Sequence, residues 1–159
     1  MLSRGIEKKQ IREFLENFFN EKASRYSLDL AFLYGSRAIG LPRRDSDVDI
    51  AVHFLETFLS EEDSFTRICD LSLRLIEGLD LDVNVIQIRE SFDRPMLYYN
   101  AIVLGIPVYV KDHEKYIRIK NEAIYQMEDY SIFGLGWQNE ITRKNLESLR
   151  NARVSIRQR

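Results

Sequence analysis

The chain has 159 residues, of which 45% are hydrophobic and 30% charged, with only 7 glycines and 3 prolines. This composition supports a buried core in about one domain and excludes a wholly disordered, collagen-like or low-complexity chain. A single cysteine, Cys69, cannot form an internal disulfide, which excludes a disulfide-bonded secreted scaffold. The 23 basic and 25 acidic residues give a net charge of -2, so general nucleic-acid binding is not expected and an anionic ligand must be held by a local site.

The sequence contains no segment typical of export or membrane insertion. Its first ten residues include three lysines or arginines and one glutamate, with no apolar stretch. The most apolar stretch, 97–110, contains Asn100, Gly105 and Pro107 and is shorter than the roughly 18 residues of a membrane helix. We therefore expect a cytoplasmic protein that contacts no membrane.

The first half of the chain predicts a helix, a strand, a loop and a second strand. The first 20 or so residues carry apolar side chains at helical spacing, namely Ile11, Phe14, Leu15, Phe18 and Phe19. Residues 28–34 form an apolar run that predicts a buried strand, and 35–46 predicts a loop that contains Arg37, Arg43 and Arg44. From 47 to 54 the pattern alternates, which predicts a strand with Val48, Ile50 and Val52 on one face and Asp47, Asp49, Ala51 and His53 on the other.

The second half predicts two further helix–strand pairs. Ser60 and the acidic residues after it indicate an N-cap, opening a helix that ends near Gly78. Its expected apolar stripe consists of Phe65, Ile68, Cys69, Leu75 and Ile76. A strand over 81–88, a helix over 94–104 and a strand over 106–111 follow.

The last 48 residues predict helix in two segments, separated by a break at 133–136, where two glycines occur. The element order predicts an α/β fold, a small mixed sheet flanked by helices, with a C-terminal helical extension. We expect a domain boundary between 1–111 and 112–159.

The strongest chemical signal is Gly35-Ser36, ten intervening residues, and then Asp47-Val48-Asp49. A glycine–serine turn at the end of a strand directs backbone N–H groups and a hydroxyl at phosphate oxygens. Two aspartates at positions i and i+2 of a strand point to the same face, about 6–7 Å apart along the chain. Carboxylates at this spacing hold hard divalent cations of the Mg²⁺ type, as two-metal phosphoryl transfer requires.

A third carboxylate is expected from a neighbouring strand, about 4.8 Å away. Asp82 is the best candidate because it opens the next alternating strand and shares a face with Asn84. Asp80 lies two residues earlier with the same parity and is the alternative.

Three segments, 34–40, 45–52 and 81–86, resemble the nucleotidyltransferases of the DNA polymerase β superfamily. In particular they resemble the minimal nucleotidyltransferases (MNT), which are the antitoxin half of HEPN/MNT toxin–antitoxin pairs. The resemblance covers roughly residues 28–111 and implies a polymerase β-like nucleotidyltransferase fold. It implies Asp47, Asp49 and Asp82 as catalytic metal ligands, with Asp82 also able to accept the proton of the acceptor hydroxyl. It implies Gly35 and Ser36 as the nucleotide-binding turn.

The implied reaction moves AMP from ATP, the substrate, onto a protein hydroxyl, with Mg²⁺ or alternatively Mn²⁺ as cofactor. The implied acceptor is a tyrosine of a cognate HEPN toxin, which this chain would silence as an antitoxin. Three alternatives stay open, namely a nucleotidyltransferase for a small molecule such as an aminoglycoside, an antitoxin that acts by binding alone, and a subunit whose nucleotide site serves regulation.

The tail adds a separate expectation. Residues 140–159 contain six basic and two acidic side chains, a net charge of +4. Ile141, Leu146, Leu149 and Ile156 occur at near-helical spacing, which predicts a basic amphipathic helix. This helix either closes the fold with its apolar stripe or docks an acidic partner protein, and non-specific nucleic-acid contact through its basic face is a lesser alternative.

Overall fold

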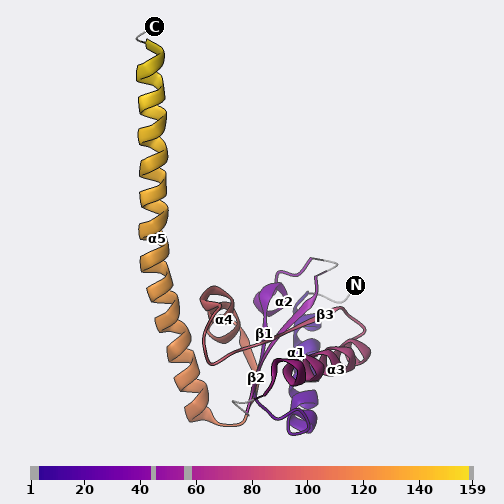
Figure 1. Cartoon of the computed structure of the whole chain (residues 1–159). Helices are drawn as coiled ribbons and strands as arrows, with labels where there is room; N and C mark the ends of the chain where they lie inside the picture. Colours follow the sequence, from indigo (N-terminus) through magenta and orange to yellow (C-terminus); the bar gives the residue numbers. More distant parts are fainter. Residues whose placement is uncertain (1–3, 44–45, 56–58, 158–159) are drawn as a thin grey trace.

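A four-stranded sheet in the order β3-β2-β1-β4 forms the centre of the computed structural model (Figure 1). The structure describes the backbone of residues 4–43, 46–55 and 59–157, and the side chains of 8–43, 46–55, 59–134, 136 and 139–147. The elements are α1 (Arg4–Lys22), β1 (Leu28–Tyr34), α2 (Gly35–Ile39), β2 (Val48–Phe54), α3 (Glu61–Leu79), β3 (Val83–Gln87), α4 (Pro95–Ile102), β4 (Ile106–Val110) and α5 (His113–Arg157). The predicted α/β class and mixed sheet are confirmed, because β1 is antiparallel to β2 and β4 whereas β2 and β3 are parallel.

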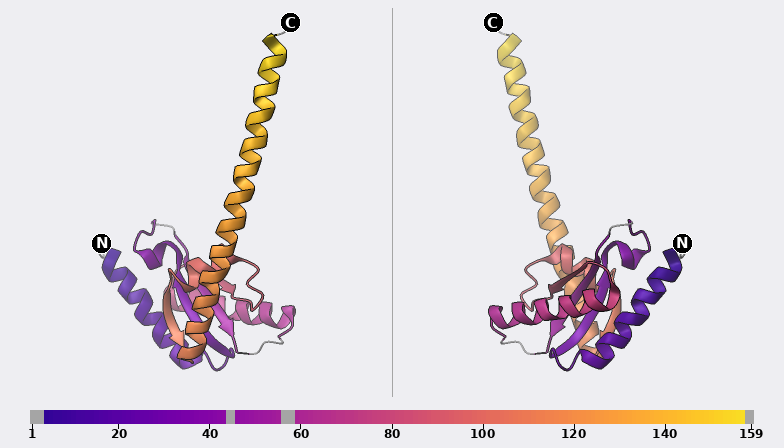
Figure 2. Two further views of the ribbon diagram at one scale, coloured as in Figure 1. Left: turned by 90° about the vertical axis from the view of Figure 1, so that its left-hand side faces the viewer. Right: turned by 90° about the vertical axis from the view of Figure 1, so that its right-hand side faces the viewer.

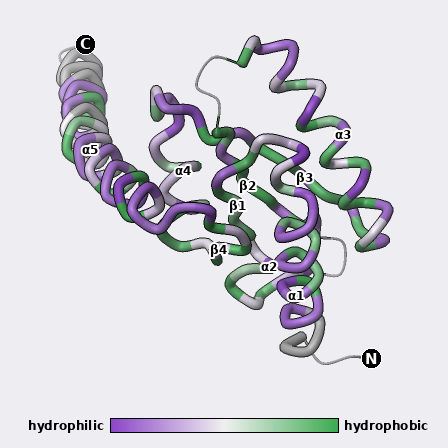
Figure 3. The backbone as a smooth tube through the Cα atoms, turned by 90° about the horizontal axis from the view of Figure 1, so that it is seen from below, coloured by the Kyte–Doolittle hydropathy of each residue, from purple (hydrophilic) through white to green (hydrophobic). Residues whose placement is uncertain are grey.

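Helices cover both faces of the sheet, and each face has its own apolar cluster. Seen from below, α1 and α3 lie on one side of the sheet and α4 and α5 on the other (Figure 3). The first cluster combines α1 and α3 with one set of strand side chains, which includes Val48, Ile50 and Val52. The second combines α4 and the start of α5 with the alternate set, which includes Ala51. The alternation predicted for β2 is therefore confirmed.

The strands of the sheet run between two opposite ends, and the candidate site and a second polar cluster lie at different ends. Here "edge" means one of these two ends and not an outer strand of the sheet. Where β1 ends and β2 begins, Tyr34 pairs with Asp49, and we call this the Asp49 edge. Where β1 begins, Leu30 pairs with His53 of β2 and with Val110 of β4, and we call this the Asp29 edge. The candidate site lies at the Asp49 edge.

Two predictions about local structure are wrong. The expected loop over 35–46 contains the short helix α2, which ends at Gly40 in the left-handed conformation. The expected break at 133–136 does not occur, because α5 runs as one helix of 45 residues. Glycine costs a helix only about 1 kcal/mol relative to alanine, which the long helical flanks tolerate.

The helix α3 begins as predicted and ends differently. The Ser60 hydroxyl accepts a hydrogen bond from the N–H of Asp63, which confirms the N-cap. The helix ends at Asp80, in the left-handed conformation, and not at Gly78. Gly78 is instead a packing position, since a Cβ there would lie 2.3 Å from Cζ of Phe14.

The expected domain boundary near residue 111 stays a prediction. The helix α5 begins at His113, and Ile119 and Ala123 in its first turns are buried in the second cluster. Beyond these turns α5 extends far from the sheet (Figure 2). Within the described residues, no helix has the combination of length and apolar character needed to cross a bilayer.

Candidate nucleotidyltransferase site

The turn that follows β1 packs directly against the side chain of Asp49. Gly35 has a φ of 74°, a left-handed conformation that glycine adopts without strain. A Cβ added to Gly35 would lie 2.4 Å from Oδ2 of Asp49, closer than real Cβ atoms approach. Glycine is thus required here twice, for its backbone conformation and for the close approach of the carboxylate.

Asn84 holds the other side of this carboxylate. In the parallel β2–β3 ladder Asp49 pairs with Asn84, and the Asn84 Nδ2 donates to Oδ1 of Asp49 over 3.4 Å. Asp47 lies just before β2 and is exposed. Asp49 therefore sits between the Gly35 turn and the Asn84 amide, with the Asp47 charge close by.

The electrostatics of this edge show a surplus of negative charge. Burial raises the pKa of Asp49, and the charge of Asp47 adds to this, while the hydrogen bond from Asn84 acts in the opposite direction. Burial and the charge of Asp49 raise the pKa of Tyr34 to about 12. Two carboxylates and an amide oxygen are the hard oxygen donors that Mg²⁺ and Mn²⁺ prefer, so these residues fit a divalent cation.

The structure places the two candidates for the third acid differently. The Asp82 carbonyl accepts a hydrogen bond of 2.8 Å from the N–H of Val48, so the ladder register puts Asp82 beside Asp47. Asp80 is the C-cap of α3 and is not part of a strand. No three His, Cys, Asp or Glu side chains in the described part of the chain lie close enough together to form a metal site. The role of Asp82 as third acid stays a prediction.

The loop arginines have structural contacts. Arg37 is 4% exposed, and its Nε donates to the carbonyl oxygen of Ser46 over 2.8 Å. The N–H of Arg43 donates to the hydroxyl of the same Ser46 over 2.8 Å. Ser46 thus accepts hydrogen bonds from α2 and from the segment that connects α2 to β2. Arg44 and Asp45 lie outside the described residues.

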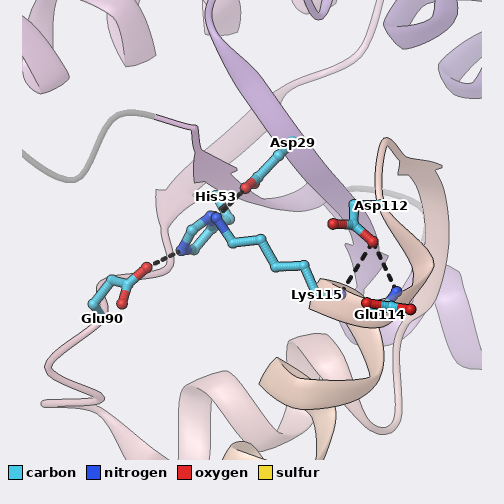
Figure 4. Close-up of polar contacts among 6 residues, drawn as sticks. All are labelled: Asp29, His53, Glu90, Asp112, Glu114 and Lys115. Carbon is cyan, nitrogen blue, oxygen red and sulfur yellow. Dashed lines mark hydrogen bonds and ion pairs between the residues drawn. The ribbon is translucent and has the colours of Figure 1, made fainter.

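A second polar cluster lies at the Asp29 edge and was not predicted (Figure 4). Asp29 is 1% exposed, and its two carboxylate oxygens contact His53 Nδ1 at 2.7 Å and Lys115 Nζ at 2.5 Å. The Nε2 of His53 lies 3.6 Å from Glu90 Oε1. A bulge between Leu28 and Leu30 interrupts the β1–β2 register here. His53, which was expected on the same strand face as Asp47 and Asp49, is buried within this cluster.

The cluster keeps a buried carboxylate ionised. Burial alone would raise the pKa of Asp29, but the contacts with His53 and Lys115 outweigh it and hold the pKa below its ordinary value. A cavity of about 750 Å³ opens at this edge, lined by His53, Ser64 and Glu90 among others. It shares no residue with the Asp49 site. The Asp29 edge therefore holds a buried ion pair, while the Asp49 edge, with its paired carboxylates, stays the candidate site.

Comparisons with known proteins show which folds and which family this chain is similar to. The structure is similar to a toxin–antitoxin complex with AMP-PNP, with a TM-score of 0.64 and 21% identity over 80% of this chain and 98% of that one. A double aspartate-to-glutamate variant of an MntA–HpeT toxin–antitoxin also gives a TM-score of 0.64, at 19% identity over 80% and 98% of the two chains. A complex of tri-AMPylated Shewanella oneidensis HEPN toxin with MNT antitoxin gives a TM-score of 0.61, at 18% identity over 82% and 98%. No curated protein matches the chain.

A protein-family model described as "Polymerase beta, Nucleotidyltransferase" matches residues 9–114. This span includes β1 to β4 and every residue of the Asp49 site. The chain belongs to the polymerase β-type nucleotidyltransferase family.

Proposed function

We propose that this chain is an antitoxin that transfers AMP from ATP to a tyrosine hydroxyl of a HEPN-type toxin. The observation that carries the proposal is the Asp49 carboxylate, held between Gly35 and Asn84 beside a second carboxylate, Asp47. A purely steric binding protein has no use for this arrangement, because it concentrates negative charge and requires a glycine against the carboxylate.

The chain's own residues would position ATP and its acceptor. The acceptor oxygen attacks the α-phosphorus of ATP, the bond to the β-phosphate oxygen breaks, and pyrophosphate leaves with the electron pair. The acceptor proton passes to a carboxylate, for which Asp82 is the candidate. Gly35 and Ser36 would present backbone N–H groups to the phosphates. Asp47 and Asp49 would hold Mg²⁺ or Mn²⁺, which supplies electrostatic stabilisation of the phosphoryl charge when bound.

The similar solved structures support the identity of nucleotide and acceptor. One of those proteins was solved with AMP-PNP, and another is an MNT antitoxin in complex with an AMPylated HEPN toxin. Since this chain shares their fold and belongs to a nucleotidyltransferase family, the same reaction class is the best supported for it. A toxin of this kind acts on RNA inside the cell, so the proposal implies a cytoplasmic protein.

The experiment is transfer of label from ATP labelled in its α-phosphate to the protein encoded by the neighbouring reading frame, which the proposal expects to be a HEPN protein, with Mg²⁺ present. We expect the toxin to gain the mass of AMP, and replacement of the modified tyrosine by phenylalanine to abolish labelling. Asp49→Asn should abolish transfer. Asp80→Asn is the control, because it makes the same isosteric change at an exposed aspartate outside the site, and asparagine tolerates the left-handed C-cap of α3.

Three outcomes would contradict the proposal. Labelling that survives Asp49→Asn would remove the assigned site. A toxin that is silenced equally well by Asp49→Asn would indicate an antitoxin that acts by binding alone. Labelling of an aminoglycoside but not of the toxin would assign the chain to small-molecule modification.

A further inference from the structure

The apolar face of α5 continues beyond the part of the helix that packs on the domain. Tyr116, Ile119 and Ala123 occur at intervals of three or four residues and contact the cluster formed with α4 and the sheet. The same spacing continues with Tyr130, Phe133, Gly134 and Ile141, which we call the α5 stripe. Tyr130, Phe133 and Ile141 are 49%, 77% and 37% exposed. The domain covers only the first part of this face.

The uncovered part of α5 projects past the Asp49 edge. The helix begins at the Asp29 edge and runs back along α4, whose C-terminal end lies near the start of β4. Since β4 is antiparallel to β1, this return brings α5 to the edge where β1 ends and α2 begins (Figure 1). At about 1.5 Å per residue, the 45-residue helix is about 67 Å long, much longer than the sheet. A protein seated on the α5 stripe would therefore lie beside the site of transfer.

Among the side chains that the structure describes, none explains two glycines on the projecting segment. A Cβ at Gly134 would have only Tyr130 Cε1 near it, at 4.0 Å, and a Cβ at Gly136 would have no atom within 4 Å. Internal packing does not require glycine at either position, although each weakens the helix by about 1 kcal/mol relative to alanine. Small residues allow the backbone of another helix to approach closely.

The charge of the tail selects the kind of partner. Residues 140–159 carry a net charge of +4, whereas the whole chain carries -2. A second copy packed side by side in the same direction would bring two such tails together, and like charges disfavour that arrangement. An acidic partner is attracted along the whole segment. On α5 itself, Lys144 pairs with Glu140 one turn earlier, at 3.0 Å.

We propose that the α5 stripe is the docking surface for the protein acceptor, a helical protein with an apolar face flanked by acidic residues. This inference rests on the proposed function, because it takes the acceptor to be a macromolecule held at the Asp49 edge. Docking on α5 would place the acceptor hydroxyl near the carboxylates without requiring contacts from the small sheet domain itself.

The test compares two faces of α5 in the full-length chain. The stripe variant is Phe133→Glu with Ile141→Glu, and the control is Leu146→Glu, an apolar residue that is 61% exposed. Leu146 was expected to share a face with Ile141, but five residues of continuous helix separate the two by about 140°, so this expectation is wrong. The side chains of Leu149 and Ile156, which were expected on the same face, lie outside the described residues. Glutamate favours helix, so all variants should keep α5 intact. Calorimetry with the neighbouring HEPN protein, without ATP, measures docking, and label transfer measures chemistry. A thermal shift with ATP and Mg²⁺ checks the nucleotide site.

We expect the stripe variant to bind the HEPN protein at least about 30-fold more weakly, and the control within about threefold. The stripe variant should keep the thermal shift and lose transfer at low acceptor concentration. Equal binding by the stripe variant and the wild type would overturn the docking surface, while leaving transfer as such intact. Tight binding that the stripe variant abolishes, together with no transfer by the wild type, would support the docking surface and overturn the proposed function. A dimer of the wild-type chain that the stripe variant dissociates would assign the stripe to a second copy and overturn the proposal.

Discussion

The contact between Gly35 and Asp49 allows the candidate site to be tested with a matched pair of substitutions. Gly35 is the first residue of α2 and Gly40 is its C-cap, and their φ angles are 74° and 80°. Alanine at either position incurs the cost of a left-handed non-glycine residue, about 1–2 kcal/mol. Only Gly35→Ala also places a Cβ against Asp49, since at Gly40 the nearest atom would be Lys8 Cδ, at 4.0 Å. The difference between the two variants therefore isolates the contact with the carboxylate.

The size of this difference follows from the distances. A Cβ at Gly35 would be 2.4 Å from Oδ2 of Asp49, and real Cβ atoms essentially never come closer than 3.0 Å, so the carboxylate must move by at least about 0.6 Å. Overpacking of this kind costs about 1–3 kcal/mol. We expect Gly40→Ala to lower the free energy of unfolding by about 1–2 kcal/mol and Gly35→Ala by about 2–5 kcal/mol. Displacement of a ligand group by this amount should reduce transfer about a hundredfold in Gly35→Ala only.

Urea denaturation measures the stability difference, and transfer of labelled AMP measures the displacement. Because Gly35→Ala could unfold the chain, both glycine variants are also made with Asp49→Ala, which removes the carboxylate. In that background the two variants should have equal stability. Equal stability in the wild-type background, or undiminished transfer by Gly35→Ala, would refute the packing of Asp49 against the turn.

Three further predictions concern the charged residues at the two edges. Asp49→Asn should raise the free energy of unfolding at neutral pH, measured by urea titration, because burial raises the pKa of Asp49 and makes its ionised form unfavourable. This gain should vanish as the pH falls, because the wild-type carboxyl group then becomes protonated. Asp82→Asn should abolish AMP transfer whereas Asp80→Asn should not, and the reverse result in the labelling assay would exchange their roles. Lys115→Met should lower the free energy of unfolding by up to about 3 kcal/mol in urea titrations, and Lys9→Met, which breaks only a surface pair, by less than about 1 kcal/mol. Since the pKa of Asp29 is lowered, its contribution is present above the ordinary aspartate range and lost as pH falls, and Lys115→Met should flatten this acid limb.

The features that depend on adjacent residues could be predicted from the sequence. Alternation over 47–54 fixes which strand side chains share a face, and both faces of β2 are covered as the pattern requires. The N-cap at Ser60 depends only on a hydroxyl and an amide three residues later. The Gly35 turn and the Asp47–Asp49 pair could also be predicted, because their chemistry is uncommon in structural strands and turns.

The features that depend on distant contacts could not be predicted. Asp29 lies in an apolar run, and only the bulge in β1 turns it toward His53 and Lys115, which is 86 positions further along the chain. Cys69 was expected in the core of α3, but it is exposed. The helix buries the stripe of Ser64, Leu71 and Leu75, a phase set by where the sheet lies and not by the hydrophobicity of α3 alone.

The position of α5 follows from the topology and links the two edges of the sheet. The β4 strand ends where β1 begins, so a helix that follows β4 must start at the Asp29 edge. There Lys115, in the first turn of α5, pairs with the buried Asp29 and fixes the start of the helix. Packing on α4 then allows only a return toward the Asp49 edge, where the sheet ends and the helix continues. If β4 were parallel to β1, it would end at the Asp49 edge. A helix that followed it would then project from the Asp29 edge, away from the carboxylates. The buried ion pair at one edge therefore determines where the exposed stripe lies relative to the chemical site at the other.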